Sequence, residues 1–231
     1  MFTRIGVVAV VGLVGALVGC GSDDSAGGST SSSAAVETTV PISVDVLSSM
    51  LLEVGDVGAG WQAGPEITDA DLADATQLPC PDTAINPTIA DRLTPATGVQ
   101  FEPDDQSYRH LVQFIVNGSP DRLAADLQVF HDAMDACAAT TPTSTDTGSL
   151  TVSRLSIPEL GDQGAGYLLV GVESPDAVWY VRQASVRIGG IAVQVGLTEI
   201  LQSPQNEPAI TDAEFFALLE AAVAKVAAAE L

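Results

Sequence analysis

Three cysteines and two histidines are the side chains of this sequence best suited to nucleophilic or metal chemistry. Cys20, Cys80 and Cys137 lie far apart and lack the paired C-x-x-C spacing of zinc sites. Neither His110 nor His131 lies in a catalytic motif, because the sequence contains no G-x-S-x-G, H-E-x-x-H or Walker pattern. We therefore expect satisfied or solvent-facing histidines, with no metal, no cofactor and no catalytic residue. The sequence favours a protein that is not an enzyme.

The first of these cysteines ends an apolar leader. After Arg4, residues 5–17 are all apolar or small, which fits the core of a signal peptide and is too short to span a bilayer. The leader ends in Leu17-Val18-Gly19-Cys20, which resembles the lipobox of bacterial lipoproteins. This resemblance implies a signal peptide over residues 1–19, cleaved before Cys20, and diacylglycerol on the Cys20 sulfur. An ordinary secretory signal with a chance cysteine is the alternative.

The other two cysteines, Cys80 and Cys137, form an even pair, as expected in a protein exported to an oxidising compartment. We predict one disulfide between them. On the chain-entropy model, closing a loop of that length stabilises a fold by about 4 kcal/mol. A metal site is the rival interpretation, but two isolated thiols lack the spacing that zinc requires.

Charge narrows the range of partners. The chain carries 30 acidic and 8 basic residues, which gives a net charge of −22 at pH 7. Such a surface repels phosphate backbones and anionic headgroups, so we expect no nucleic-acid partner and a membrane contact made only through lipid on Cys20. Cations and cationic envelope components remain open as partners.

The chain divides into three parts. Residues 1–19 form the predicted signal peptide, and residues 20–43 form the lipidated cysteine and a disordered tether, because their Ser, Gly, Thr and Ala content leaves little to bury. Residues 44–231 are long enough for one domain with a sizeable core.

Periodicity predicts several helices in this domain. A first helix is expected over residues 44–54 and a short one within residues 82–93. The strongest begins at Ser119-Pro120-Asp121, which combines an N-cap serine with a proline at the first helical position. Its apolar face holds Leu123, Leu127, Phe130, Met134 and Cys137. The last helix opens at the capping box of Thr211 and Glu214.

Alternating patterns predict strands over residues 99–101, 108–117, 150–157, 167–172, 178–188 and 191–198. The last two form a hairpin through Gly189-Gly190, in which Ile188 pairs with Ile191. That register makes one face mostly apolar and the other mostly polar, with Arg182 as an exception expected at the rim of the core. We predict an α+β fold: a single domain with a twisted, mostly antiparallel sheet and helices packed on one face.

Two further groups of residues carry weaker signals. Asp69, Asp71 and Asp74 lack the spacing of a calcium loop, so no ion site is expected. Trp61 and Trp179 are expected in the core, with an apolar ligand pocket as the alternative. Ligand-binding residues remain unknown at this level.

Short motifs along the domain resemble a known family. Leu51-Leu52, the run Asp56-Val57-Gly58-Ala59-Gly60-Trp61, Cys80-Pro81 and Leu160-Gly161-Asp162-Gln163 are similar to sensor-domain lipoproteins of actinobacteria, which are related in pattern to the extracellular domain of PknH-type receptor kinases. The resemblance covers roughly residues 45–226. It implies a sheet with helices and a role in sensing or binding an envelope ligand. The extracellular domain of these receptor kinases is expected to carry two disulfides, whereas only one is possible in this chain.

The function predicted from the sequence is a cell-envelope lipoprotein that binds or senses an extracytoplasmic ligand without catalysis. The predicted location is the outer face of the cell membrane, reached by export and lipid anchoring. An accessory or structural subunit that docks on another envelope protein is the alternative. It would present an exposed patch, such as the polar sheet face between Gln183 and Gln194, in place of a pocket.

Overall fold

The computed structural model describes residues 42–74, 87–105, 107–139, 143–145, 148–174, 177–202 and 207–229. The predicted signal peptide, the predicted tether up to residue 41 with Cys20, and also Cys80 lie outside these ranges. The last two residues assigned to the tether belong to the domain instead, since Ser43 Oγ accepts from Val46 N at the start of the first helix and Ile42 packs against the core. All the described residues belong to one unit of the chain, which spans Thr39–Leu231.

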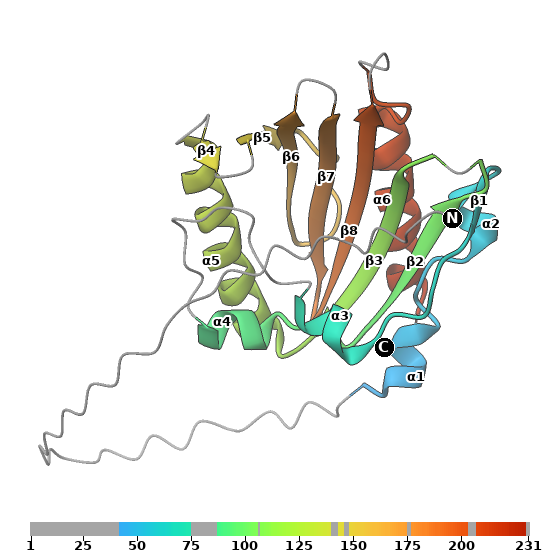
Figure 1. The fold of residues 1–231 in the computed structure, drawn as a ribbon. Helices are drawn as coiled ribbons and strands as arrows, with labels where there is room; N and C mark the ends of the chain where they lie inside the picture. The colour runs from blue at the N-terminus through green and yellow to red at the C-terminus, as the bar shows by residue number, and fades with distance from the viewer. Residues whose placement is uncertain are drawn as a thin grey trace, which may run out of the picture. The chain divides into compact units, whose positions relative to one another are not determined.

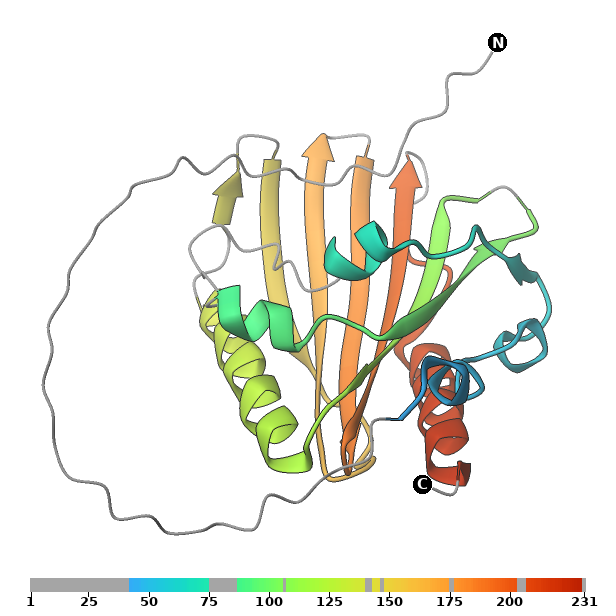
Figure 2. The same cartoon turned by 90° about the horizontal axis from the view of Figure 1, so that it is seen from below.

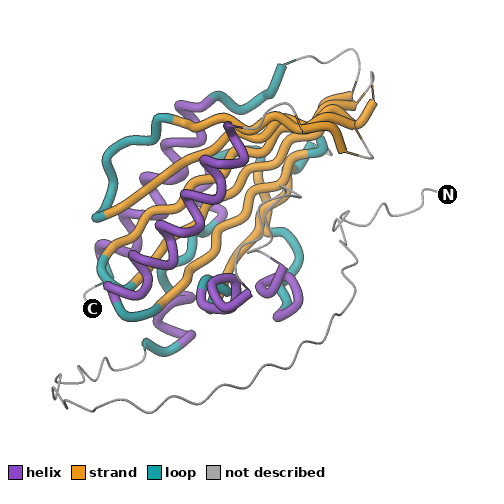
Figure 3. Tube along the Cα trace, turned by 90° about the vertical axis from the view of Figure 1, so that its left-hand side faces the viewer, coloured by secondary structure: helices purple, strands orange, loops and turns teal. Residues whose placement is uncertain are grey.

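An antiparallel sheet of eight strands forms the centre of the described residues, in the order β1-β2-β3-β8-β7-β6-β5-β4 (Figure 1). Figure 3 shows these strands as one twisted layer. The three long strands β6, β7 and β8 occupy its middle. The strands are β1 (Trp61–Ala63), β2 (Thr97–Pro103), β3 (Arg109–Asn117), β4 (Thr143–Thr145), β5 (Gly148–Leu155), β6 (Gln163–Ser174), β7 (Ala177–Ile188) and β8 (Ile191–Gln202).

Six helices accompany the sheet in the described ranges. They are α1 (Val44–Ser48), α2 (Val54–Val57), α3 (Asp69–Asp74), α4 (Pro87–Arg92), α5 (Pro120–Ala139) and α6 (Asp212–Ala228). The capping box of α6 is present as predicted, since Thr211 Oγ1 accepts from Glu214 N and the Glu214 carboxylate accepts from Thr211 N.

The predicted first helix over residues 44–54 is wrong in its length. It ends at Ser48, where the Ser49 hydroxyl donates to Val46 O at 2.7 Å. Leu52 N then donates to Gln113 Oε1 on β3 at 2.6 Å instead of to a carbonyl one turn earlier. A strand side chain therefore takes the hydrogen bond that would have continued the helix.

The hairpin of β7 and β8 has the predicted register. Ile188 pairs with Ile191, Val186 with Val193 and Ala184 with Val195. Its two glycines serve different purposes. Gly189 adopts a left-handed φ of 57°, whereas a Cβ on Gly190 would lie 2.6 Å from Gly118 O.

Helices cover both faces of the sheet, which corrects the prediction that they pack on one face. One core joins α6 to apolar residues of β3, β7 and β8, and a second joins α5 to the opposite faces of β5, β6 and β8. Figure 2 shows α1 and α2 beside α6. The predicted α+β class and antiparallel sheet are confirmed. Polar residues on the second face, Ser185 and Gln194 among them, are buried, so polarity there did not mean exposure to solvent.

Arg182 lies inside the core and not at its rim. It is 5% exposed, and its guanidinium pairs with the buried Glu199 at 3.1 Å and with Asp212 at 2.8 Å. Glu199 Oε1 also accepts from the backbone N–H groups of Ala209 and Ile210. The charge is thus matched by partners that tie the start of α6 to the sheet.

Candidate functional site

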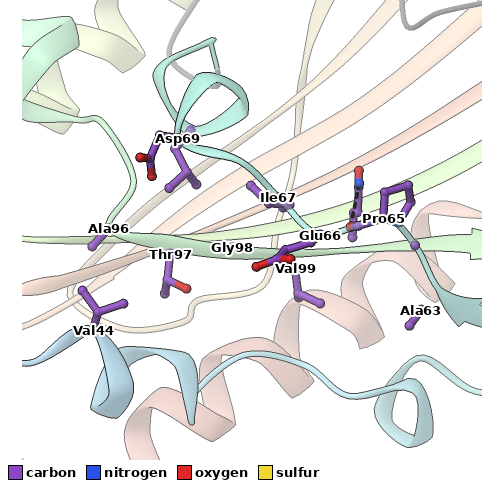
Figure 4. A pocket seen from close by; sticks show the side chains of 13 residues that line it. Val44, Ala63, Pro65, Glu66, Ile67, Asp69, Ala96, Thr97, Gly98 and Val99 are labelled. Atoms are coloured by element: carbon purple, nitrogen blue, oxygen red, sulfur yellow. Dashed lines mark hydrogen bonds between the residues drawn. The ribbon is translucent and has the colours of Figure 1, made fainter.

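A groove of about 400 Å³ runs along the outer edge of β2 (Figure 4). One wall is β2 itself, over residues 97–100. The opposite wall is the segment of residues 63–72, which leads from β1 into α3, and Val44 of α1 closes one end. We refer to this hollow as the β2 groove.

Hydrogen bonds hold the two walls together at the β1 end. Gly64 N donates to Gln100 O at 2.9 Å, and Gln100 Nε2 donates to Pro65 O at 2.9 Å. The approach is close at Gly64, where a Cβ would lie 3.0 Å from Gln100 Cγ and 3.1 Å from its carbonyl oxygen. Beyond Pro65 the segment no longer pairs with β2 and forms the opposite wall of the groove.

Contacts with β2 and α6 hold the residues around the end wall in place. The hydroxyls of Ser48 and Thr97 lie 3.1 Å apart and join α1 to β2. Behind α1, Lys225 of α6 donates to Leu51 O at 3.0 Å and pairs with Asp56 at 2.7 Å. Burial opposes the charge of Lys225, but its hydrogen bonds to Asp56 and Glu53 outweigh this and raise its pKa.

The lining of the β2 groove mixes apolar and acidic side chains. Ile67, Leu72 and Val99 are half-buried, whereas Val44 is 56% exposed. Glu66 and Asp69 contribute carboxylates, and none of the described residues that line the hollow is basic. Within the described residues no group of His, Cys, Asp or Glu is arranged to hold a metal ion. The arrangement suits a ligand held by apolar contact and carboxylates.

Of the two histidines, His131 has the contact that most resembles a catalytic pair, although no catalytic role was predicted for it. Its Nε2 lies 2.7 Å from Ser185 Oγ, the contact that a hydrolase would need. Both residues are buried, however, at 3% and 4% exposure. The Tyr167 hydroxyl donates to His131 O at 3.1 Å. The pair therefore joins α5 to the sheet as a buried, satisfied contact.

His110 lies on β3 and contacts Gln100, one of the residues that line the β2 groove. Its Nε2 is 2.6 Å from Gln100 Oε1, and Gln100 Nε2 is already committed to Pro65 O. The amide oxygen therefore accepts, and His110 Nε2 carries the proton. Burial lowers the pKa of His110, against the opposing charge of Glu102, and so favours the neutral ring.

Of the three cysteines, Cys137 lies within the described residues. Cys137 is buried near the C-terminal end of α5 at 3% exposure, on the apolar face where the sequence placed it. Cys20 and Cys80 lie outside the described residues, so lipidation and the disulfide stay predictions. Trp61 and Trp179 are both half-buried against the core.

The β2 groove was not predicted from the sequence. Its walls come from residues 63–72 and 96–100, which only the pairing of β1 with β2 brings together. Two signals were nevertheless present. Pro65 has no backbone N–H and so cannot donate to a strand partner, and residues 5–91 contain no lysine or arginine.

No described helix is long and apolar enough to cross a membrane. No protein-family model and no curated protein matches the chain. Among solved structures, the chain is similar to the extracellular domain of PknH from Mycobacterium tuberculosis, with a TM-score of 0.53 and 16% sequence identity. That match covers 81% of this chain and 98% of the other.

A putative uncharacterized protein from Mycobacterium smegmatis also matches, with a TM-score of 0.36 and 15% identity over 76% of this chain and 97% of the other. The PknH match, at 16% identity, shows a similar fold. The chain is therefore similar in fold to the extracellular domain of PknH, which confirms the resemblance expected from its sequence.

Proposed function

We propose that the chain is an exported lipoprotein whose domain binds or senses a ligand at the outer face of the cell membrane, without catalysis. One observation carries this proposal: a fold shared with an extracellular domain follows, in one chain, an apolar leader that ends in Leu17-Val18-Gly19-Cys20. A diacylglyceryl group on Cys20 supplies the two acyl chains that stable anchoring requires.

The interior of the domain supports a binding role over catalysis. Its two histidines are engaged in internal contacts, with Ser185 and with Gln100. The β2 groove is the hollow that we assign to the ligand. The face between Gln183 and Gln194, named above as one example of a docking patch, is largely covered, since Gln194 is 5% exposed and Gln183 is half-buried.

Membrane attachment is tested by replacing the proposed acylation site. We expect the wild-type chain in the membrane fraction, with a diacylglyceryl group on Cys20 found by mass spectrometry of the N-terminal peptide. Cys20→Ala should carry no acyl group and leave the membrane fraction. Ser22→Ala, two residues away, is the control and should behave as the wild type. An unacylated wild-type chain in the cytosol would refute the lipoprotein proposal.

Ligand binding is tested separately on the purified full chain in detergent. Thermal unfolding is measured with and without extracts of the cell envelope, because a ligand that binds only the folded state raises the unfolding temperature. We expect the extract to raise the unfolding temperature. An extract from which the protein has first removed its ligand by dialysis should no longer do so. An unchanged unfolding temperature, with no co-purified ligand in native mass spectrometry, would leave a membrane lipoprotein without the binding role.

A further inference from the structure

The outer edge of β2 has a strand partner along only part of its length. Gly60, Gln62 and Gly64 face Asp104, Glu102 and Gln100, and the last hydrogen bond of this series runs from Gly64 N to Gln100 O. Backbone groups alternate in direction along a strand. The next outward N–H and C=O therefore belong to Gly98, and no described strand pairs with them.

Gly98 lies on the wall of the β2 groove. It has to be glycine because a Cβ would lie 2.5 Å from the Phe114 ring on β3, so nothing on this residue shields its backbone. An open strand edge beside a groove is the geometry with which proteins bind extended peptides by adding a strand. A peptide in this place would extend the pairing where Pro65 turns the chain away.

Side chains of the groove suit alternate residues of such a peptide. Ile67 and Val99 offer half-buried apolar surface on facing walls, and the carboxylates of Glu66 and Asp69 are exposed (Figure 4). A strand presents its residues alternately to opposite sides. A peptide in which an apolar residue follows a basic one could therefore place the first against apolar side chains of the groove and the second beside its carboxylates.

Charge decides the class of this peptide. Every lysine and arginine of the described residues already pairs with a carboxylate; these are Arg92, Arg109, Arg122, Arg154, Arg182, Arg187 and Lys225. In the same part of the chain no ion pair reaches Glu66 or Asp69. A basic ligand would thus meet carboxylates with no internal partner, in the field of a chain of net charge −22. An anionic ligand would find no free cation there.

We propose that the β2 groove binds an extended, cationic segment of a partner protein, which adds a strand at Gly98 and places lysine or arginine side chains beside Glu66 and Asp69. This inference rests on the proposed binding function and names the class of its ligand. Apolar side chains of the segment pack against Ile67 and Val99. The partner is a protein of the envelope with an exposed basic segment.

The test uses the purified full chain in detergent and fluorescent eight-residue peptides. The probe alternates lysine and valine; a glutamate–valine peptide reverses its charge, and a lysine–valine peptide N-methylated at alternate residues removes half of its backbone donors. We expect the first to bind roughly tenfold more tightly than either of the others. Spermidine, which has charge but no backbone, should not compete at a similar charge concentration.

Two double variants with the same change in net charge locate the binding site. Glu66→Gln with Asp69→Asn should weaken the lysine–valine peptide roughly fivefold. Glu159→Gln with Glu220→Gln alters exposed carboxylates elsewhere and should change the affinity less than about twofold. The Gly98 amide should also become protected from hydrogen exchange when the peptide binds.

Three results would overturn the inference: no binding, equal weakening by both double variants, or equal affinity for the N-methylated peptide. Each would leave the proposed function standing if envelope extracts still stabilised the chain, and if the groove variant responded to them as the wild type does. If the extracts also had no effect, the binding function itself would fall.

Discussion

At the scale of single residues, His131 shows how the fold controls an ionisable group. The ring lies between α5 and the sheet, near Phe130 and Tyr167. Burial lowers its pKa to about 4, the Arg154 charge acts in the same direction, and Asp135 and Asp132 oppose it. The neutral ring is thus the form that the packed helix accepts.

This arrangement predicts a pH dependence of stability. In the unfolded chain His131 titrates near its ordinary pKa of about 6.5. Between that value and the folded pKa of about 4, the unfolded state binds more protons, so stability falls as the pH drops. We expect a loss of about 2 kcal/mol between pH 7 and pH 5, measured by urea unfolding.

His131→Gln removes the titrating group from this position and keeps a polar side chain opposite Ser185. Its overall stability should be lower, but its change between pH 7 and pH 5 should be clearly smaller than that of the wild type. Carboxylates contribute equally to both proteins, so the difference isolates the histidine. A pH dependence that is the same in both would show that His131 ionises freely in the folded state.

At the scale of elements, the turn between β7 and β8 sets two kinds of constraint on neighbouring glycines. Gly189 has a φ of 57° but open space around it, so Gly189→Ala should cost about 1 kcal/mol of left-handed strain. Gly190 touches the chain leading into α5, since Gly118 N donates to Gly190 O at 2.9 Å. Gly190→Ala should cost more, roughly 2 kcal/mol, because the new Cβ meets backbone.

Urea unfolding midpoints of the two variants test this order. Gly189→Asn is the control, because asparagine tolerates the left-handed region and should be nearly neutral. An equal loss from Gly189→Ala and Gly190→Ala would mean that the loop before α5 can move away from the turn without cost.

The same hairpin shows what sequence patterns can predict at this scale. Its register follows from a period of two and a glycine turn, both of which are local. The second helical layer does not follow, because Ser185 is polar yet buried against His131, 54 residues away in sequence. The break after α1 depends similarly on Gln113, which lies 61 residues from Leu52. Long-range partners satisfy these polar groups, and periodicity does not record them.

At the scale of the whole molecule, opposite charges are distributed unequally. All the basic side chains in the described ranges are used in ion pairs, and two of the acidic partners, Asp126 and Glu199, are buried. Most of the other carboxylates face solvent and repel one another. This asymmetry was visible in the composition, but the pairing that leaves Glu66 and Asp69 without partners was not.

A net charge of −22 destabilises the compact folded state, because its many negative charges repel one another. At 0.1 M salt, exposed charges more than about 10 Å apart are largely screened from one another, whereas the buried pair of Arg182 and Glu199 is little affected. The urea midpoint should therefore rise between 10 and 200 mM NaCl, values that bracket this screening range. Glu159→Lys with Glu220→Lys lowers the negative charge and should be more stable than the wild type at low salt, with a smaller response to added salt. A midpoint that falls with salt would mean that surface ion pairs contribute more to stability than repulsion removes.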